Sequence, residues 1–437
     1  MRILLLTDEV WNDKIHGNNG LTNWFEGFPA ELAHIYLDSG IPHNRCCSRY
    51  YQITDKMMLR SIVTGCRAGR RFEYHIEDVP EEDAFPEQEN KAFYFFMKRI
   101  ATESTRLLRD WIWLLGRYDM EEIKDFINDF NPDIIFTLRY ASRKMLRFER
   151  LVSQLTDCPM IAFTGDDEYR LLQLHLSPIY WLRRICLRRY FRRTIPIYRK
   201  YYMLSELQAD LYHRQFHIET DILRKCGDFS EEFHIKGWHS PIRLVYAGKI
   251  YCNRWKTLLQ IKAALERINE YEIRMVLHIY TKDRITKRRR RQLSDGRSTF
   301  LMKPVDANRL KVIYQEADIA LHVEAFDIKN RWLTRYSFST KIIDCLASSC
   351  TVVAICPEEH AGYQYLKGQD AAICISRNEK IYPCLRKLVL KPKILYRYQK
   401  KAWECGVHYH KREIVREKLY QDMQSICKAK ADITKLE

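Results

Sequence analysis

Hydroxyl and basic side chains gather in residues 334–350, where they could bind an anion. Apolar residues at 342–347 recur at helical spacing, so we expect a helix to open near Ser339. The first N–H groups of a helix lack intrahelical partners and carry the positive end of its dipole. The segment therefore predicts a phosphate site, with a capped helix and two solvated cations as the alternative. Its side chains would be Arg335, Ser337, Ser339, Thr340 and Lys341.

Two short apolar runs flank this helix in the sequence. Residues 319–324 and 351–355 are typical of buried strands, which makes the helix the crossover of a parallel βαβ unit. Ligands in open α/β sheets bind at the carboxyl ends of strands, where this helix begins. The position therefore favours a ligand site over a simple cap.

The same alternation of strands and helices runs through residues 241–400. One predicted strand ends in Gly248, and the cations Lys249 and Arg254 follow it. The repeated pattern predicts a doubly wound domain. Further strands are predicted at 273–280 and 300–302, and helices at 255–268, from 287 and from 306. The basic run at 287–291 is expected to be a solvated helix face, with a membrane or polyphosphate contact as the alternative.

A similar alternation in residues 1–225 predicts a second doubly wound domain. A strand at 2–7 is followed by Asp8 and Glu9, a glycine-containing loop that includes Gly20, and a predicted helix over 21–37. The loop matches neither a dinucleotide-binding nor a Walker pattern, so it is either a plain turn or part of an acceptor pocket. Further helices are predicted at 90–115 and 120–130, and further strands at 134–138, 159–164 and 201–206.

Acidic residues follow the predicted strand at 159–164. Asp166, Asp167 and Glu168 would lie at its carboxyl end, on the edge of the sheet where ligands bind. They could bind an acceptor hydroxyl or serve as a general base. Asp166 could equally cap the next helix, which is a frequent role of aspartate.

Arginine pairs alternate with aromatic and aliphatic residues between 177 and 204. The pairs Arg188–Arg189 and Arg192–Arg193 are the centre of this stretch, which holds no acid. A basic, aromatic-rich helix suits the surface of an anionic membrane. The alternative is a solvated basic face whose apolar stripe packs on the sheet. Binding of nucleic acid is not favoured, because no reading helix, zinc finger or RNA-binding strand pattern is present.

Composition limits the class of protein. The chain of 437 residues is longer than one hydrophobic core usually supports. Its content of 46% hydrophobic and 30% charged residues is typical of a folded globular chain. The net charge of +17 attracts phosphates of some kind. The fourteen cysteines form no Cys-x-x-Cys pair, so we expect reduced thiols and no zinc site. Without an apolar run that spans a bilayer or a signal peptide, we expect a cytoplasmic protein, peripheral on the inner face of the membrane.

These patterns divide the chain into four segments. We predict an acceptor-side domain over 1–225, a linker over 226–240, a nucleotide-sugar domain over 241–400 and a C-terminal helix over 401–437 that packs back across the cleft. The acidic stretch around 77–89 is expected to be an exposed insertion.

Residues 242–366 resemble the glycosyltransferases of the GT-B fold, especially the family 4 members that assemble bacterial polysaccharides. The resemblance rests on Gly248-Lys249, on Arg254, on the phrase at 314–321 and on the block at 335–353. It implies an α/β protein with two Rossmann-like, doubly wound domains that face each other across a cleft.

The resemblance also implies roles for single residues. Gly248, Lys249 and Arg254 would hold the donor diphosphate, Met302 and Val305 would border the nucleotide base, and Asp344 would bind ribose. The first of two glutamates that the family carries is replaced by Tyr336, so Glu324 is the candidate for the sugar site.

The implied reaction is transfer of a sugar from a nucleotide-sugar donor to a glycan or lipid-linked acceptor in cell-surface polysaccharide synthesis. Cations and a helix start can stabilise the leaving diphosphate, so we expect transfer without a metal or other cofactor. The resemblance favours retention of configuration; an inverting course would need a base, for which Asp166, Asp167 and Glu9 are candidates. The alternatives are a nucleotide-sugar epimerase and a basic membrane or nucleic-acid adaptor that keeps the fold.

Overall fold

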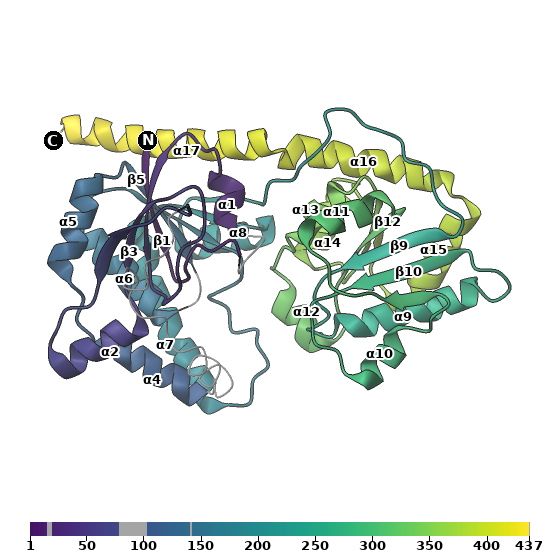
Figure 1. Ribbon diagram of the computed structural model, residues 1–437, viewed down its shortest axis with the longest axis horizontal. Coiled ribbons are helices and arrows are strands. Elements are labelled where there is room, and N and C mark those ends of the chain that lie inside the picture. Colours follow the sequence, from purple (N-terminus) through teal and green to yellow (C-terminus); the bar gives the residue numbers. More distant parts are fainter. Residues whose placement is uncertain (15–19, 78–102, 140–141, 437) are drawn as a thin grey trace. The chain divides into compact units, whose positions relative to one another are not determined.

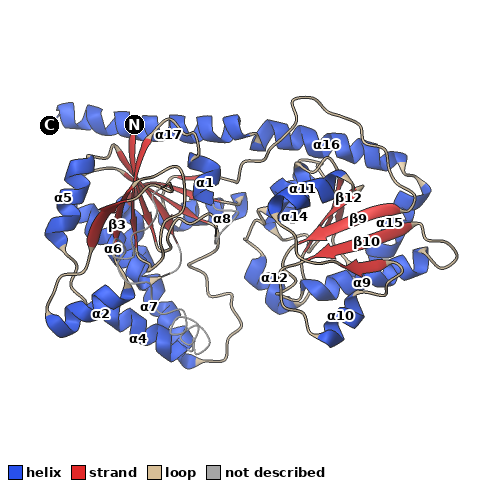
Figure 2. Cartoon of the chain, viewed as in Figure 1, coloured by secondary structure: helices blue, strands red, loops and turns tan. Residues whose placement is uncertain are grey.

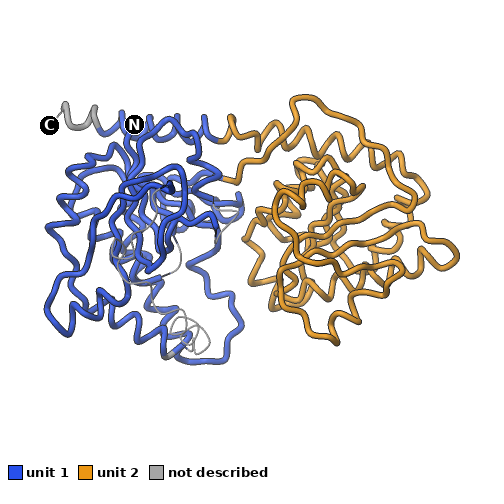
Figure 3. The backbone as a smooth tube through the Cα atoms, viewed as in Figure 1, with its two compact units in different colours: residues 1–223, 416–437 blue, residues 224–415 orange. Residues whose placement is uncertain are grey.

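The computed structural model describes residues 1–14, 20–77, 103–139 and 142–436 (Figure 1). Unit 1 contains residues 1–223 and 416–437, and unit 2 contains residues 224–415 (Figure 3). Each unit is built around one β-sheet with helices beside it (Figure 2). The predicted insertion from residue 78 on, and the predicted helix over 90–102, lie outside the described residues.

The sheet of unit 1 has eight strands in the order β4-β3-β2-β1-β5-β6-β7-β8. All neighbouring pairs are parallel except β3 with β4. The central strands are almost continuously buried, which is typical of a parallel sheet covered on both faces. The strands are β1 (Arg2–Thr7), β2 (Glu31–Tyr36), β3 (Arg49–Gln52), β4 (Arg70–Glu73), β5 (Ile134–Arg139), β6 (Met160–Thr164), β7 (Tyr198–Met203) and β8 (Thr220–Ile222).

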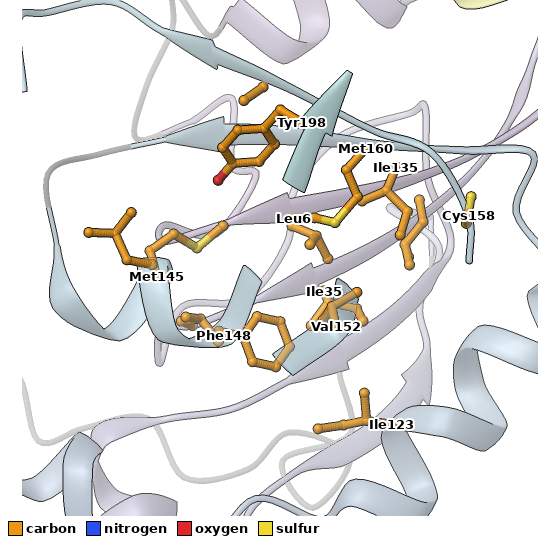
Figure 4. Close-up of a cluster of buried hydrophobic side chains, with 14 of the residues drawn as sticks. Leu6, Ile35, Ile123, Ile135, Met145, Phe148, Val152, Cys158, Met160 and Tyr198 are labelled. Atoms are coloured by element: carbon orange, nitrogen blue, oxygen red, sulfur yellow. The ribbon is translucent and has the colours of Figure 1, made fainter. Parts of the chain in front are cut away.

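Amphipathic helices cover this sheet. In α6 the apolar side chains of Met145, Phe148 and Val152 follow helical spacing and belong to one core cluster with strand residues such as Leu6 and Ile135 (Figure 4). The helices of unit 1 are α1 (Gly20–Phe25), α2 (Asp55–Thr64), α4 (Glu103–Leu115), α5 (Met120–Phe130), α6 (Arg143–Leu155), α7 (Pro178–Thr194) and α8 (Glu206–Phe216).

The prediction of a helix over 21–37 is wrong beyond Phe25. Gly27 has a φ of +71°, in the left-handed region, and Pro29 follows it, so the helix ends after α1. Residues 32–36 are buried and pair in parallel with β1 as part of β2. The apolar run that resembled a helix face is therefore a strand buried on both faces.

The sheet of unit 2 has six parallel strands in the order β11-β10-β9-β12-β13-β14. The predicted doubly wound architecture is confirmed here. The strands are β9 (Ile242–Ala247), β10 (Met275–Tyr280), β11 (Thr299–Leu301), β12 (Ile319–Val323), β13 (Thr351–Ile355) and β14 (Ile373–Ile375). The helices are α9 (Arg254–Ile268), α10 (Lys287–Leu293), α11 (Ala307–Gln315), α12 (Ile328–Thr334), α13 (Lys341–Leu346), α14 (Ala361–Gly368), α15 (Ile381–Leu390) and α16 (Lys393–His410).

The C-terminal region contains two helices, α16 and α17 (Arg412–Leu436). From Arg416 on, α17 belongs to unit 1, where Lys418 pairs with Asp221 at 2.7 Å and Tyr202 donates to Asp422 at 2.9 Å. The region 226–240, predicted as a linker, contains no helix or strand and belongs to unit 2, where Glu231 pairs with Lys411 at 2.9 Å. Among the described residues, no helix is both long and apolar enough to span a bilayer.

Candidate functional site

The strand order of each sheet reverses at one place, and that is where α/β sheets bind ligands. In unit 2 the reversal lies between β9 and β12, which are neighbours in the sheet. Strand β9 runs into Gly248, and β12 runs into Glu324. Helix α9 begins soon after the first of these strands, at Arg254. Three of the residues singled out from the sequence thus lie at this edge.

Lys341 reaches Gly248 from the first turn of α13. A Cβ built on Gly248 would overlap the Lys341 ammonium nitrogen and lie 2.7 Å from its Cε. The same nitrogen is 5.8 Å from the ring centroid of Tyr246 in β9. Only glycine at position 248 therefore leaves the ammonium group in this place.

Among the described residues, Lys341 has no neutralising neighbour in direct contact. Within the described part of the chain, no carboxylate oxygen lies within 4 Å of its ammonium group, and no hydrogen bond to that group occurs. Burial, together with the charge of Arg254, lowers the pKa of Lys341 from 10.5 to about 8. At neutral pH the site thus contains a partly desolvated cation that an anion would stabilise.

Arg254 and Glu324 form a bidentate ion pair beside it. Nε and Nη2 of Arg254 donate to the two carboxylate oxygens, both at 2.8 Å, and the side chains are only 12% and 8% exposed. Burial opposes the charge of Arg254, but Glu324 raises its pKa overall. Thr257 in α9 donates to the Glu324 backbone carbonyl at 2.8 Å, which fixes the strand end. Arg254 therefore keeps its charge but shares it with Glu324.

The remaining predicted diphosphate ligands are Lys249, Arg335, Ser339 and Thr340. Lys249 is exposed, with its ammonium 5.5 Å from the ring centroid of Tyr251. Arg335 is also exposed. Thr340 is the N-cap of α13 without a side-chain capping bond, and Ser339 accepts from the Ile342 amide at 3.0 Å through its carbonyl. The helix begins two residues later than predicted and contains only six residues.

The predicted nucleoside residues lie on two different elements. Met302 and Val305 belong to the loop after β11, and the Met302 amide donates to the Ile279 carbonyl at 2.9 Å. Asp344 lies in α13, where Lys225 donates to its carboxylate at 2.6 Å. A ribose hydroxyl at Asp344 would have to share that carboxylate with Lys225.

In unit 1 the candidate bases have different surroundings. Asp167 accepts from the Tyr169 and Arg170 amides at 3.1 and 3.2 Å and from the Tyr212 hydroxyl at 3.0 Å, so it holds a turn. Asp166 and Glu9 are exposed. Gly20 is the first residue of α1.

The four central arginines of α7 divide into two pairs. The Arg188 guanidinium lies 4.3 Å from the ring centroid of Tyr169, and Arg192 donates to the hydroxyl of the same tyrosine. Arg189 and Arg193 are exposed, and neither has a hydrogen bond or ion pair within the described ranges. As far as the described residues go, two of the four are therefore available to an external anionic partner.

Solved structures resemble the chain over nearly its whole length. Sucrose-phosphate synthase from Thermosynechococcus elongatus aligns with a TM-score of 0.58 and 12% identity, covering 98% of this chain and 100% of that one. An E. coli trehalose-6-phosphate protein bound with UDP-2-fluoro glucose aligns with a TM-score of 0.56 and 10% identity, covering 97% and 99%. A trehalose-phosphate synthase from Burkholderia xenovorans in complex with glucose-6-phosphate aligns with a TM-score of 0.53 and 9% identity, covering 97% and 100%.

The chain has the GT-B fold. No protein-family model matches the sequence, and no curated protein sequence matches it. The predicted fold is thus confirmed, while the resemblance to family 4 stays a prediction.

Two buried histidines of this GT-B chain were not singled out by their sequence positions. His322 in β12 is 5% exposed, and burial lowers its pKa to about 4. His360, before α14, is 2% exposed; burial lowers its pKa, although Glu324 opposes this. Its Nε2 atom is buried and has no hydrogen-bond partner among the described residues. The sequence feature that could have pointed to His322 is its position two residues before Glu324.

Proposed function

We propose that the protein is a glycosyltransferase, which moves a sugar from a nucleotide-sugar donor to a glycan or lipid-linked acceptor. The observation that supports this most is the Lys341 ammonium at the strand reversal of unit 2, which lies against Gly248 and contacts no carboxylate of the described residues. A diphosphate there would pair with a cation that already lies in a low-dielectric site, where charge pairs are stronger than in water.

The structural neighbours support the substrate class. The E. coli neighbour is bound with UDP-2-fluoro glucose, and the B. xenovorans neighbour with glucose-6-phosphate. By analogy of fold, we propose a nucleotide sugar as donor and a second sugar-containing molecule as acceptor. The finer assignment to family 4, and to cell-surface polysaccharide synthesis, rests on the sequence resemblance at Gly248, Arg254 and residues 335–353.

In this proposal the protein stabilises the leaving group by fixed charge. As the bond between sugar and diphosphate breaks, negative charge grows on the diphosphate next to Lys341, with Arg254 and Lys249 as further cations. The same role is often filled by a metal, and we propose transfer without one. The proposed course is retaining, so no side chain is given the role of nucleophile. Asp166 or Glu9 would be the base in an inverting course.

A membrane surface is the proposed environment of the acceptor. In unit 1, α2 packs on α4 and α4 on α7, and each leaves large apolar side chains exposed, including Val63 at 77%, Trp111 at 55% and Leu182 at 60%. The exposed cations Arg189 and Arg193 lie on α7. Apolar side chains with neighbouring cations suit the interface of an anionic membrane.

Product analysis tests the proposal. The full chain would be incubated with UDP-, GDP- and ADP-sugars, with and without lipid extracts that contain glycan acceptors. A glycosyltransferase releases the nucleoside diphosphate and labels the acceptor only when both substrates are present. Conversion of the donor sugar without acceptor would show an epimerase instead. Absence of nucleotide binding together with steeply salt-dependent DNA binding would favour the adaptor.

A further inference from the structure

A strongly basic cavity lies in unit 1, between α4, the first turn of α6 and α7. It has a volume of about 290 Å³. Its charged lining consists of one carboxylate, Asp110, and six cations: Arg106, Arg109, Arg143, Lys144, Arg183 and Arg184. Charges of one sign are rarely concentrated in a protein cavity, because they repel one another and lose hydration.

Part of this charge is neutralised by acids around the cavity. Arg183 pairs with Glu103 at 2.7 Å and with Asp110 at 3.3 Å. Further ion pairs within the described residues join Arg106 with Glu103, Arg109 with Asp55, Lys144 with Asp8 and, at 3.8 Å, Arg143 with Asp110. Among the described residues, these six cations thus form ion pairs with four carboxylates, Asp8, Asp55, Glu103 and Asp110, two fewer than the cations.

The excess is located on Arg143 and Arg184. The nearest carboxylate oxygen to Arg143 belongs to Asp110, at 3.8 Å, and its guanidinium lies 5.0 Å from the ring centroid of Tyr190. Within the part of the chain that the structure describes, Arg184 donates only to the backbone carbonyls of Asp167 and Arg170, at 3.3 and 2.9 Å. Two guanidinium groups without close carboxylates are suited to phosphate, whose oxygens accept in a bidentate manner.

The cavity lies near the strand reversal of its own sheet. The order reverses between β1 and β5. Asp8 follows β1, and Lys144, in the first turn of α6, pairs with it while donating to the Leu37 carbonyl at 2.6 Å. Ser142 caps α6 by accepting from the Met145 amide at 3.3 Å. Because Lys341 and Gly248 occupy the corresponding edge in unit 2, the edge in unit 1 is left for the second substrate.

We infer that this cavity binds a phosphate group of the acceptor, so that the acceptor is a phosphorylated sugar or a lipid-borne phosphate. The acceptor role rests on the proposed glycosyltransferase function; the binding of phosphate at this cavity does not. The cavity positions the acceptor through its phosphate, and no bond to that phosphate forms or breaks.

Calorimetric titration of the full chain tests this inference. The probes are glucose 6-phosphate and, as the lipid arm, phosphatidylcholine vesicles with and without a polyprenyl phosphate. Each titration is repeated in a K341A background, because phosphate could also bind at Lys341 in unit 2. UDP affinity is measured in the same preparations, so that failure of the donor site is seen separately from failure of the cavity.

Two substitutions in the cavity lining should change phosphate affinity in opposite directions. Arg143→Gln should weaken phosphate affinity by about tenfold or more, because a charge-assisted bond is lost. Asp110→Asn removes the one acid of the lining and should tighten binding by about threefold or more. Arg214→Gln, exposed on α8 of the same unit, is the control and should bind as the wild type does.

Each outcome decides the inference. Arg143-dependent binding of glucose 6-phosphate indicates a sugar phosphate, and Arg143-dependent binding of only the polyprenyl phosphate vesicles indicates a lipid-borne phosphate; both support it. Equal affinities in wild type, R143Q and D110N, or no saturable binding of any probe to wild type, would overturn it.

Discussion

The ammonium group of Lys341 occupies the space beside Gly248 that the Cβ of any other residue would fill. The end of β9 and the start of α13 therefore depend on each other, although 93 residues separate them in the sequence. This relationship places a desolvated cation at the edge of the unit 2 sheet. It is the feature on which the donor site depends.

Replacing Gly248 tests this arrangement without removing the lysine. In Gly248→Ala the new Cβ displaces the Lys341 ammonium, which can swing away because it ends a flexible side chain. We expect nucleoside diphosphate affinity to fall about tenfold or more, with little change in melting temperature. Gly237→Ala is the matched control in unit 2, since a Cβ there meets no atom within 4 Å. Unchanged affinity in G248A would show that the ammonium position is irrelevant to binding.

Lys341 should lower the unfolding free energy of the protein. Burial and Arg254 lower its pKa from 10.5 to about 8. Keeping the charge in the folded state then costs up to about 3 kcal/mol, and Lys341→Met should raise the unfolding free energy at pH 7 by up to that amount. Urea unfolding of the two proteins measures this difference.

The pH dependence provides an internal check. Between pH 8 and 10.5 the folded wild type binds fewer protons at Lys341 than the unfolded chain. Its unfolding free energy should therefore rise with pH across this window, and this rise should be missing in K341M. A K341M protein less stable than wild type at pH 7 would indicate that the lysine serves the fold rather than a ligand.

The pair of Arg254 and Glu324 should behave as a coupled unit. Arg254→Met leaves a carboxylate that is only 8% exposed without its partner, so we expect a loss of about 3 kcal/mol of stability. Arg254→Met combined with Glu324→Met should recover most of this loss, because both buried charges are removed. A double-mutant cycle from denaturant unfolding gives the coupling. Additive effects would contradict the bidentate pair.

The exposed arginines of α7 should govern membrane binding. Changing Arg189 and Arg193 together to glutamate should release the protein from vesicles that contain anionic lipid, since neither arginine has a hydrogen bond or ion pair within the described residues. The same charge change at Arg290 and Arg291, exposed on α10, is the control. Sedimentation with vesicles measures the bound fraction. If both double variants bind equally, the α7 surface is not the membrane contact.

The sequence alone predicts much of the fold because its strong periodicities are local. The helix over 120–130 and the strands at 2–7 and 351–355 have the predicted bounds. The failure at 32–36 has a physical cause: a strand buried on both faces has no polar alternation, so its apolar residues also fit a helix.

The site was predictable as a set of residue types, and its pairings were not. Lys341, Gly248 and Arg254 could be named from the sequence, but the displacement of a Cβ by an ammonium group requires the fold. The bidentate contact of Arg254 with Glu324 joins positions 70 residues apart. The basic cavity of unit 1 is harder to predict from the sequence, because its cations come from three helices that are separate in the sequence.

Comparison of a nucleoside with its diphosphate tests the donor site most directly. Uridine, UDP and the matching guanosine and adenosine pairs would be titrated into wild type and Lys341→Ala by calorimetry. For the base that binds, we predict that K341A weakens diphosphate affinity about tenfold or more and leaves nucleoside affinity unchanged. Equal diphosphate affinity in the two proteins would contradict the assignment of Lys341 to the donor diphosphate.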